Sequence, residues 1–85
     1  MLPDEGRQLM TPTQQLIAQV WRELLEVDAV KADDVFLELG GNSLTAGMVA
    51  NQLQEAVGYR PTMAEIFRGT LADLAARVDA ALGKG

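Results

Sequence analysis

The stretch "LELGGNSLTAG", residues 37–47, places two glycines, an asparagine and a serine directly before an apolar helical pattern. Serine is a preferred helix N-cap and contributes about 0.5–2 kcal/mol there, so capping alone can explain Ser43. A cap at Ser43 cannot form a capping box, however, because Ala46 stands three residues later. Gly40 and Gly41 keep side chains away from the hydroxyl and allow backbone angles that other residues resist. Because a helix N-terminus also favours an anion, Ser43 is a candidate for phosphate attachment.

Three other helix starts surround this stretch, and each begins with a threonine that opens a capping box. The boxes pair Thr11 with Gln14, Thr62 with Glu65, and Thr70 with Asp73. Apolar residues at a period of 3.6 predict helices over about residues 12–26, 43–57, 63–68 and 71–82. The sequence shows no alternating strand pattern. We therefore predict an all-α fold, a four-helix bundle with a short third helix.

Residues 27–42 form a connection that is long for a chain of 85 residues. A loop of this length is usually functional or packed by its own side chains. We expect it to be ordered, with a short helical turn at residues 33–37 and four apolar residues packed on the bundle. These are Val30, Val35, Phe36 and Leu39. The expected organisation is an N-terminal tail or linker at 1–10, a folded domain at 11–82 and a C-terminal tail at 83–85.

The composition excludes most kinds of catalytic site. The chain has no cysteine and no histidine, which removes disulfides, thiol nucleophiles, most zinc sites and histidine-based triads. The sequence Gly41-Asn42-Ser43-Leu44-Thr45 lacks the last glycine of a G-x-S-x-G nucleophile elbow. No pair of carboxylates is spaced to act on Ser43. We therefore expect a protein that has no catalytic residues of its own and no metal site.

Charge and hydropathy limit the environment and the partners. The formal net charge is −5, which argues against nucleic acid as a partner. The longest uncharged run, residues 39–54, is too short and too polar to span a bilayer. The first ten residues contain early acidic residues and no apolar core, unlike a secretion signal. We expect a cytoplasmic protein that does not enter a membrane.

The second predicted helix has apolar residues on two faces. Its core face contains Ala46, Val49, Ala50, Leu53, Ala56 and Val57. Leu44 and Met48 lie on the opposite face beside Ser43, which makes them candidates for partner contact, unless they are incidental or covered by the long loop. On the third helix, Met63 and Phe67 are further candidates, because so short a helix cannot bury both completely. For Phe67 we favour core packing.

The segment "DDVFLELGGNSLTA", residues 33–46, resembles the signature of the peptidyl carrier (thiolation) domains of non-ribosomal peptide synthetases. The shared features are an acidic residue, an aromatic–aliphatic pair and Leu-Gly-Gly-x-Ser-Leu. A looser similarity extends over about residues 11–82. The residue before the serine is often His or Asp in this family, whereas here it is Asn42, which leaves the choice of downstream partner open.

The resemblance implies a bundle of the acyl-carrier type with 4′-phosphopantetheine attached to Ser43 and flanked by Gly41 and Asn42. A phosphopantetheinyl transferase would transfer the group from coenzyme A with Mg²⁺. The thiol of the group would carry aminoacyl or peptidyl thioesters between enzymes of non-ribosomal peptide biosynthesis. The implied partners are therefore the transferase, an adenylation enzyme, and condensation, tailoring or thioesterase enzymes, with the carrier itself a monomer.

Two alternatives remain. An acyl or aryl carrier of a polyketide or hybrid pathway would share the fold and the serine, but such carriers typically have a strongly acidic second helix. Because residues 39–54 carry no charge, the peptidyl class is favoured. The other alternative is an unmodified helical protein-interaction module that docks through Leu44 and Met48.

Overall fold

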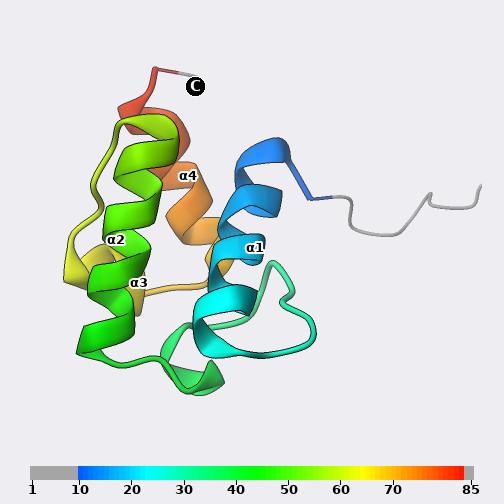
Figure 1. The fold of residues 1–85 in the computed structure, drawn as a ribbon. Helices are drawn as coiled ribbons and strands as arrows, with labels where there is room; N and C mark the ends of the chain where they lie inside the picture. Colours follow the sequence, from blue (N-terminus) through cyan, green and yellow to red (C-terminus); the bar gives the residue numbers. More distant parts are fainter. Residues whose placement is uncertain (1–9, 84–85) are drawn as a thin grey trace, which may run out of the picture.

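Four α-helices and one 3₁₀ turn make up residues 10–83, the part of the chain described by the structure, a computed structural model. The helices are α1 (Pro12–Leu25), α2 (Ser43–Val57), α3 (Met63–Phe67) and α4 (Leu71–Ala81), and the 3₁₀ turn is Leu37–Leu39. Helix α1 packs against both α2 and α4, and the short α3 contacts α2 and α4 (Figure 1). The predicted all-α, four-helix bundle with a short third helix is confirmed for residues 10–83.

The helix ends follow local capping rules. The three predicted threonine capping boxes, at the starts of α1, α3 and α4, are all formed. Helix α2 ends at Val57 as expected, because Gly58 takes a left-handed conformation with φ 84°. Helix α1 ends one residue before its predicted end, since Glu26 turns left-handed with φ 58°. Local sequence therefore determines most of the boundaries.

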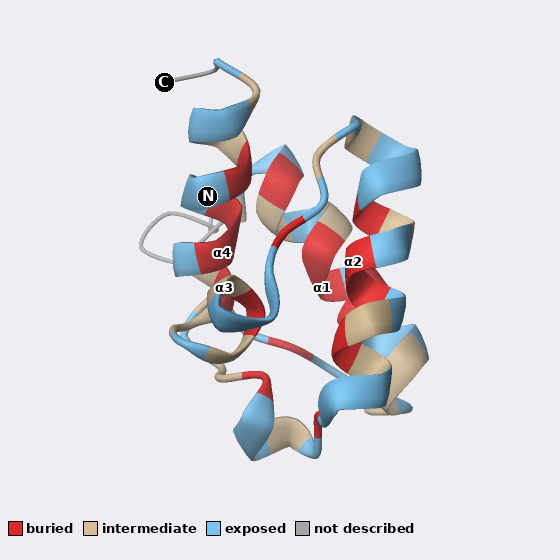
Figure 2. Cartoon of the chain, turned by 90° about the vertical axis from the view of Figure 1, so that its left-hand side faces the viewer, coloured by how far each residue is buried: buried red, intermediate tan, exposed pale blue. Residues whose placement is uncertain are grey.

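The core lies between α1, α2 and α4 and is closed by the long connection and α3. Figure 2 shows the buried residues on the facing sides of these helices. The largest fully buried side chains are Trp21, Phe36, Ile17, Leu53, Ile66, Leu71, Leu74, Val49 and Val78. One predicted core residue, Ala56, is instead exposed. Ala56 lies about 80° around the helix from Ala46, at the edge of the apolar stripe and on the last turn of α2.

The long connection is ordered and is attached to the start of α4. The N–H of Leu71 donates to the carbonyl of Asp34 at 2.9 Å, and Val35 pairs with Thr70 in an isolated antiparallel bridge. Val30 and Phe36 are buried, and Val35 and Leu39 are half-buried, as expected. The helical turn expected at residues 33–37 is wrong, because the bridge keeps Val35 extended. The turn forms after Phe36, at Leu37–Leu39.

The two predicted tails lie largely outside the described residues. Met10 is half-buried against the core, and residues 1–9 and 84–85 are not described. The domain limits at residues 11 and 82 therefore stay predictions. None of the helices between residues 10 and 83 is both long and apolar enough to cross a membrane.

Candidate functional site

Ser43 is the first residue of α2, but it is not the cap of this helix. Asn42 is the N-cap: its Oδ1 accepts from the N–H of Thr45 at 3.0 Å, and the hydroxyl of Thr45 accepts from the N–H of Asn42 at 2.9 Å. The expectation that α2 begins without a capping box is therefore wrong. The box is shifted by one residue, because asparagine caps as well as serine does.

Because the box is shifted, the hydroxyl of Ser43 is not needed to cap the helix. The side chain is exposed, and it makes no hydrogen bond with any residue between 10 and 83. The first turn of α2 contains no acidic residue, so the partial positive charge of the helix N-terminus is not neutralised there. The position can thus accept a covalently attached anion without loss of a cap.

The two glycines before the serine have different roles. Gly40 ends the 3₁₀ turn with φ 98°, a left-handed conformation that favours glycine, and a Cβ on it would meet nothing within 4 Å. Gly41 is buried, and a Cβ on it would overlap three ring carbons of Phe36, the farthest at 2.8 Å. Gly41 therefore faces the core and not the approach to the hydroxyl. The sequence pattern alone did not indicate this contact.

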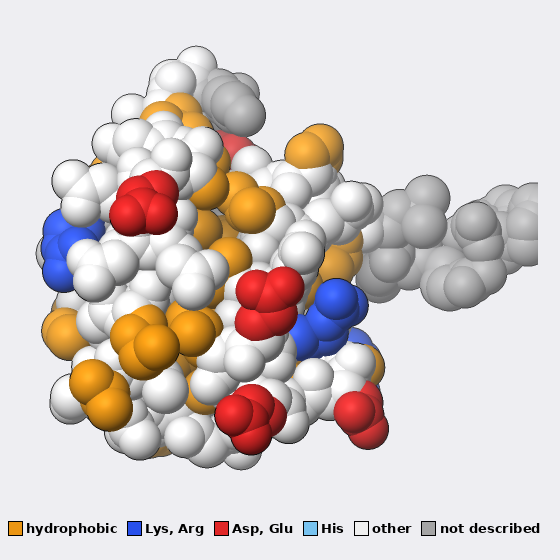
Figure 3. Space-filling view, in the orientation of Figure 1, with side chains coloured by type: hydrophobic (Ala, Val, Ile, Leu, Met, Phe, Trp, Pro, Cys, Tyr) orange, Lys and Arg blue, Asp and Glu red, His pale blue; other side chains and the backbone are white. Residues whose placement is uncertain are grey.

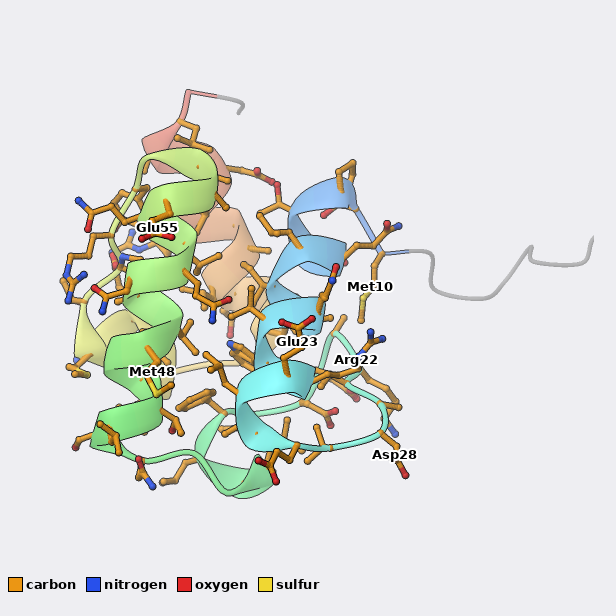
Figure 4. The ribbon with its side chains drawn as sticks, in the orientation of Figure 1. Met10, Arg22, Glu23, Asp28, Met48 and Glu55 are labelled. Carbon is orange, nitrogen blue, oxygen red and sulfur yellow. The ribbon has the colours of Figure 1, made fainter. Side chains whose placement is uncertain are left out.

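An exposed apolar surface adjoins Ser43. It consists of the four large hydrophobic residues that are exposed in the described part of the chain: Leu37 (60%), Leu44 (75%), Met48 (42%) and Met63 (46%). We call this set the Leu44 face. In Figure 3 hydrophobic side chains gather over the Ser43 end of α2, and Figure 4 shows Met48 pointing outward from that helix. Large exposed hydrophobic side chains gathered over one part of a surface are typical of an interaction site.

The predicted partner-contact residues do not all lie on this surface. Leu44, Met48 and Met63 are exposed, and the terminal methyl group of Met63 lies 3.8 Å from the position that a Cβ on Gly47 would take. Phe67 is half-buried and packs edge-to-face on Phe36, with ring centroids 5.6 Å apart, as favoured for it.

Leu37 was not predicted as a contact residue. The pair Phe36–Leu37 could have indicated its exposure, because adjacent side chains point in different directions and Phe36 is buried in the core.

A polar cluster holds α3 in place beside this face. One carboxylate oxygen of Glu65 accepts from the hydroxyl of Tyr59 at 2.7 Å and from the N–H of Thr62 at 3.0 Å, and the other lies 3.3 Å from Nε of Arg77. The hydrogen bond from Tyr59, then that from Thr62, then the charge of Arg77 lower the pKa of Glu65. The same hydrogen bond raises the pKa of Tyr59.

Sequence reasoning found the bond between Thr62 and Glu65 as a capping box, but it missed Tyr59 and Arg77.

Two depressions in the described surface are lined by no residue of α2. One, of about 470 Å³, lies between α3 and α4, and another, of about 590 Å³, lies between the long connection and α4. Ser43 lines neither of them. No cluster of three potential metal-ligating side chains occurs within residues 10–83. Because the side chain of Ser43 is exposed, any chemistry at its hydroxyl takes place at the surface of the molecule.

Comparison with known proteins agrees with this geometry. Residues 15–78 match the family described as "Phosphopantetheine attachment site". A linear gramicidin synthase of Brevibacillus parabrevis is 40% identical over 70 residues, and the match covers 81% of this chain and 1% of that protein. The dimodular nonribosomal peptide synthase of Bacillus subtilis is 33% identical over 75 residues, and the match covers 87% of this chain and 3% of that protein. The chain thus spans only a small part of the length of these relatives.

Two solved structures are also similar. A chain in the structure of the phosphopantetheine transferase Sfp in complex with coenzyme A and a peptidyl carrier protein is 25% identical, with a TM-score of 0.80, and the match covers 85% of this chain and 95% of that chain. A chain in the structure of McyG A-PCP complexed with phenylalanyl-adenylate is 32% identical, with a TM-score of 0.74, and the match covers 88% of this chain and 12% of that chain.

Proposed function

The chain belongs to the phosphopantetheine attachment-site family, and on that premise we propose that it is a peptidyl carrier whose prosthetic group is attached to Ser43. The cofactor predicted from the sequence, covalently attached 4′-phosphopantetheine, is confirmed by this membership. The observation that supports Ser43 as the attachment residue is its exposed hydroxyl at the start of α2, which is free because Asn42 supplies the cap. Ser43 is also the only serine in the chain.

The attachment step needs little from this chain beyond a presented hydroxyl. Oγ of Ser43 forms a bond to the phosphorus next to pantetheine in coenzyme A, and adenosine 3′,5′-bisphosphate leaves. The hydroxyl proton passes to a base on the transferase, because the chain has no histidine or cysteine and no described carboxylate lies within hydrogen-bond reach of the Ser43 hydroxyl. N–H groups in the first turn of α2 stabilise the resulting phosphodiester charge.

Carrier domains of this kind are generally non-catalytic, and we propose that this chain has no catalytic residues of its own. Once attached, the group supplies the thiol on which aminoacyl or peptidyl intermediates are held as thioesters. Ser43 lies on an open surface that lines neither depression, so activation and transfer take place in the sites of partner enzymes. The role of the helical body is to present Ser43 and to be recognised.

The Leu44 face is the surface that we propose partners recognise. Chains similar to this one occur in solved structures with a phosphopantetheine transferase and with an adenylation domain. We extend these partners to condensation, tailoring and thioesterase enzymes, which must each reach the same attached group. Because one carrier visits them in turn, we expect interfaces below about 1,200 Å², the size typical of transient contacts.

Intact-mass spectrometry tests the proposal. The protein is incubated with coenzyme A, Mg²⁺ and a broad-specificity phosphopantetheinyl transferase, and one phosphopantetheine should be added. Ser43→Ala should add none and still fold, since alanine is a strong helix former and Asn42 remains the cap. Thr45→Ser is the matched control, because it keeps the hydroxyl of the capping box and introduces a second serine. It should still add one group, and only at Ser43.

Failure of the wild-type protein to gain mass would contradict the carrier function and leave the unmodified interaction module. A second step distinguishes a peptidyl carrier from an acyl or aryl carrier. In it, the protein that carries phosphopantetheine is offered to amino-acid-activating and to acyl-activating enzymes. The charge pattern favours loading by the amino-acid-activating enzymes, because α2 carries a single charged residue, Glu55, near its C-terminal end (Figure 4). Loading by the acyl-activating enzymes alone would contradict the peptidyl assignment.

A further inference from the structure

We propose that Phe36 is a positioning residue for Ser43: its buried ring holds the backbone of Gly41 and thereby fixes where α2 begins and where the hydroxyl is presented. This inference rests on the proposed function, because presentation matters only if Ser43 is the attachment residue. Phe36 is fully buried and acts through Gly41, two residues before the serine.

Phe36 contacts Gly41 through both its backbone and its ring. The N–H of Gly41 donates to the carbonyl of Phe36 at 3.0 Å, and the ring occupies the space that a Cβ on Gly41 would need. Gly40 and Asn42, on either side of Gly41, are exposed, whereas Gly41 is buried. Gly41 is therefore the point at which the turn before α2 contacts the core.

The ring of Phe36 is itself fixed by two helices. Trp21 of α1 contacts it with ring centroids 5.1 Å apart and an interplanar angle of 61°. Phe67 of α3 contacts it at 5.6 Å and 68°. Edge-to-face aromatic pairs of this kind have a preferred geometry, so the ring gives the turn a fixed position relative to both helices.

A positioning role and a docking role have different kinetic signatures. The Leu44 face contributes to binding, so substitutions there should raise KM for the transferase reaction. Phe36 and Gly41 are buried and contribute no side chain to that face, but they set the position of the reacting oxygen, so substitutions there should lower kcat more than they raise KM.

The experiment compares Gly41→Ala, Phe36→Val, the double variant and Leu74→Ala in transfer from coenzyme A by the broad-specificity transferase. All four are assayed at a temperature at which circular dichroism shows them folded. Gly41→Ala should lower kcat about tenfold, because small displacements of a reacting atom are costly. Phe36→Val alone should also lower kcat, because the ring that holds Gly41 is lost. The double variant should recover most of either loss, since the new methyl group takes the space of the ring carbons that valine lacks. Leu74→Ala, in the core of α4, should lower the melting temperature without changing kcat.

Three results would overturn the positioning role: a wild-type kcat for Gly41→Ala, a double variant no better than Gly41→Ala, or a loss of kcat in Leu74→Ala that matches its loss of stability. If Gly41→Ala does not fold, Phe36→Val decides, and an unchanged kcat overturns the role. Absence of transfer to the wild-type protein would instead overturn the proposed function, and this inference with it.

Discussion

The two segments that flank the Leu44 face are held in different ways. The turn before Ser43 is fixed by a fully buried aromatic ring against a glycine backbone, a contact that involves no charge. Helix α3, which brings Met63 to the same face, also packs on the core through Ile66 and Phe67. In addition it is held by the carboxylate of Glu65 and its partners Tyr59, Thr62 and Arg77. The turn before Ser43, the proposed attachment residue, therefore depends on packing, whereas α3 depends in addition on polar contacts that pH and salt can weaken.

The largest expected effect comes from breaking the packed side. Phe36→Ala should cost about 3–5 kcal/mol of the free energy of unfolding, as truncation of a buried phenylalanine usually does. Urea unfolding followed by circular dichroism measures it. A smaller loss than that of Glu65→Ala would contradict the contrast between the two segments.

Breaking the polar side should cost less. Glu65→Ala removes an acceptor in the capping box and the partner of the Tyr59 hydroxyl, and we expect a loss of about 1–2 kcal/mol. Glu55→Ala is the matched control on α2, where an exposed substitution should stay within about 0.5 kcal/mol. If both variants unfold at the same urea concentration, Glu65 does not hold α3.

The pH dependence of stability sharpens the same comparison. The pKa of Glu65 is lowered in the folded protein, chiefly by the hydrogen bond from Tyr59. The ionised carboxylate therefore contributes its full stabilisation at pH values above 4.5, the ordinary pKa of a glutamate. This contribution is lost as pH falls through the lowered pKa. The melting-temperature difference between wild type and Glu65→Gln should therefore be constant near neutral pH and shrink in acid. A difference that does not change with pH would show that the charge is irrelevant.

The smallest effect should come from Arg77. Its side chain is 65% exposed and lies 3.3 Å from the carboxylate, so Arg77→Ala should cost no more than about 0.5 kcal/mol. Added salt should reduce even this difference, because exposed pairs are screened. A loss as large as that of Glu65→Ala would mean that the ion pair, and not the hydrogen bond from Tyr59, fixes α3.

How far the sequence predicts this molecule depends on the range of the interactions. Periodicity and the threonine boxes act within a few residues, and they correctly predict the four helices and most of their ends. The resemblance to peptidyl carrier domains is confirmed by the family match over residues 15–78.

The errors arise where two residues compete or where contacts are long-range. Asn42 and Ser43 are both good caps, and only the structure shows that Asn42 is used. The turn near residues 33–37 was misplaced because the bridge between Val35 and Thr70 joins residues far apart in the chain. The ion pair of Glu65 with Arg77 was missed for the same reason. The contacts of Phe36 with Gly41 and of Tyr59 with Glu65 are local, and they were missed because neither periodicity nor a capping rule predicts them. The limits of the domain and the role of Ser43 stay predictions until they are tested.

The use of Asn42 as the cap has a consequence for how folding and modification of the protein are related. Since the side chain that caps the helix is not the one that we propose is esterified, gain or loss of the prosthetic group leaves every bond of the cap in place. Covalent modification and folding are then nearly independent of each other. The unmodified chain should therefore fold completely before any transferase acts on it, and the modified form should melt at the same temperature or slightly higher, because the helix N-terminus favours the phosphodiester charge.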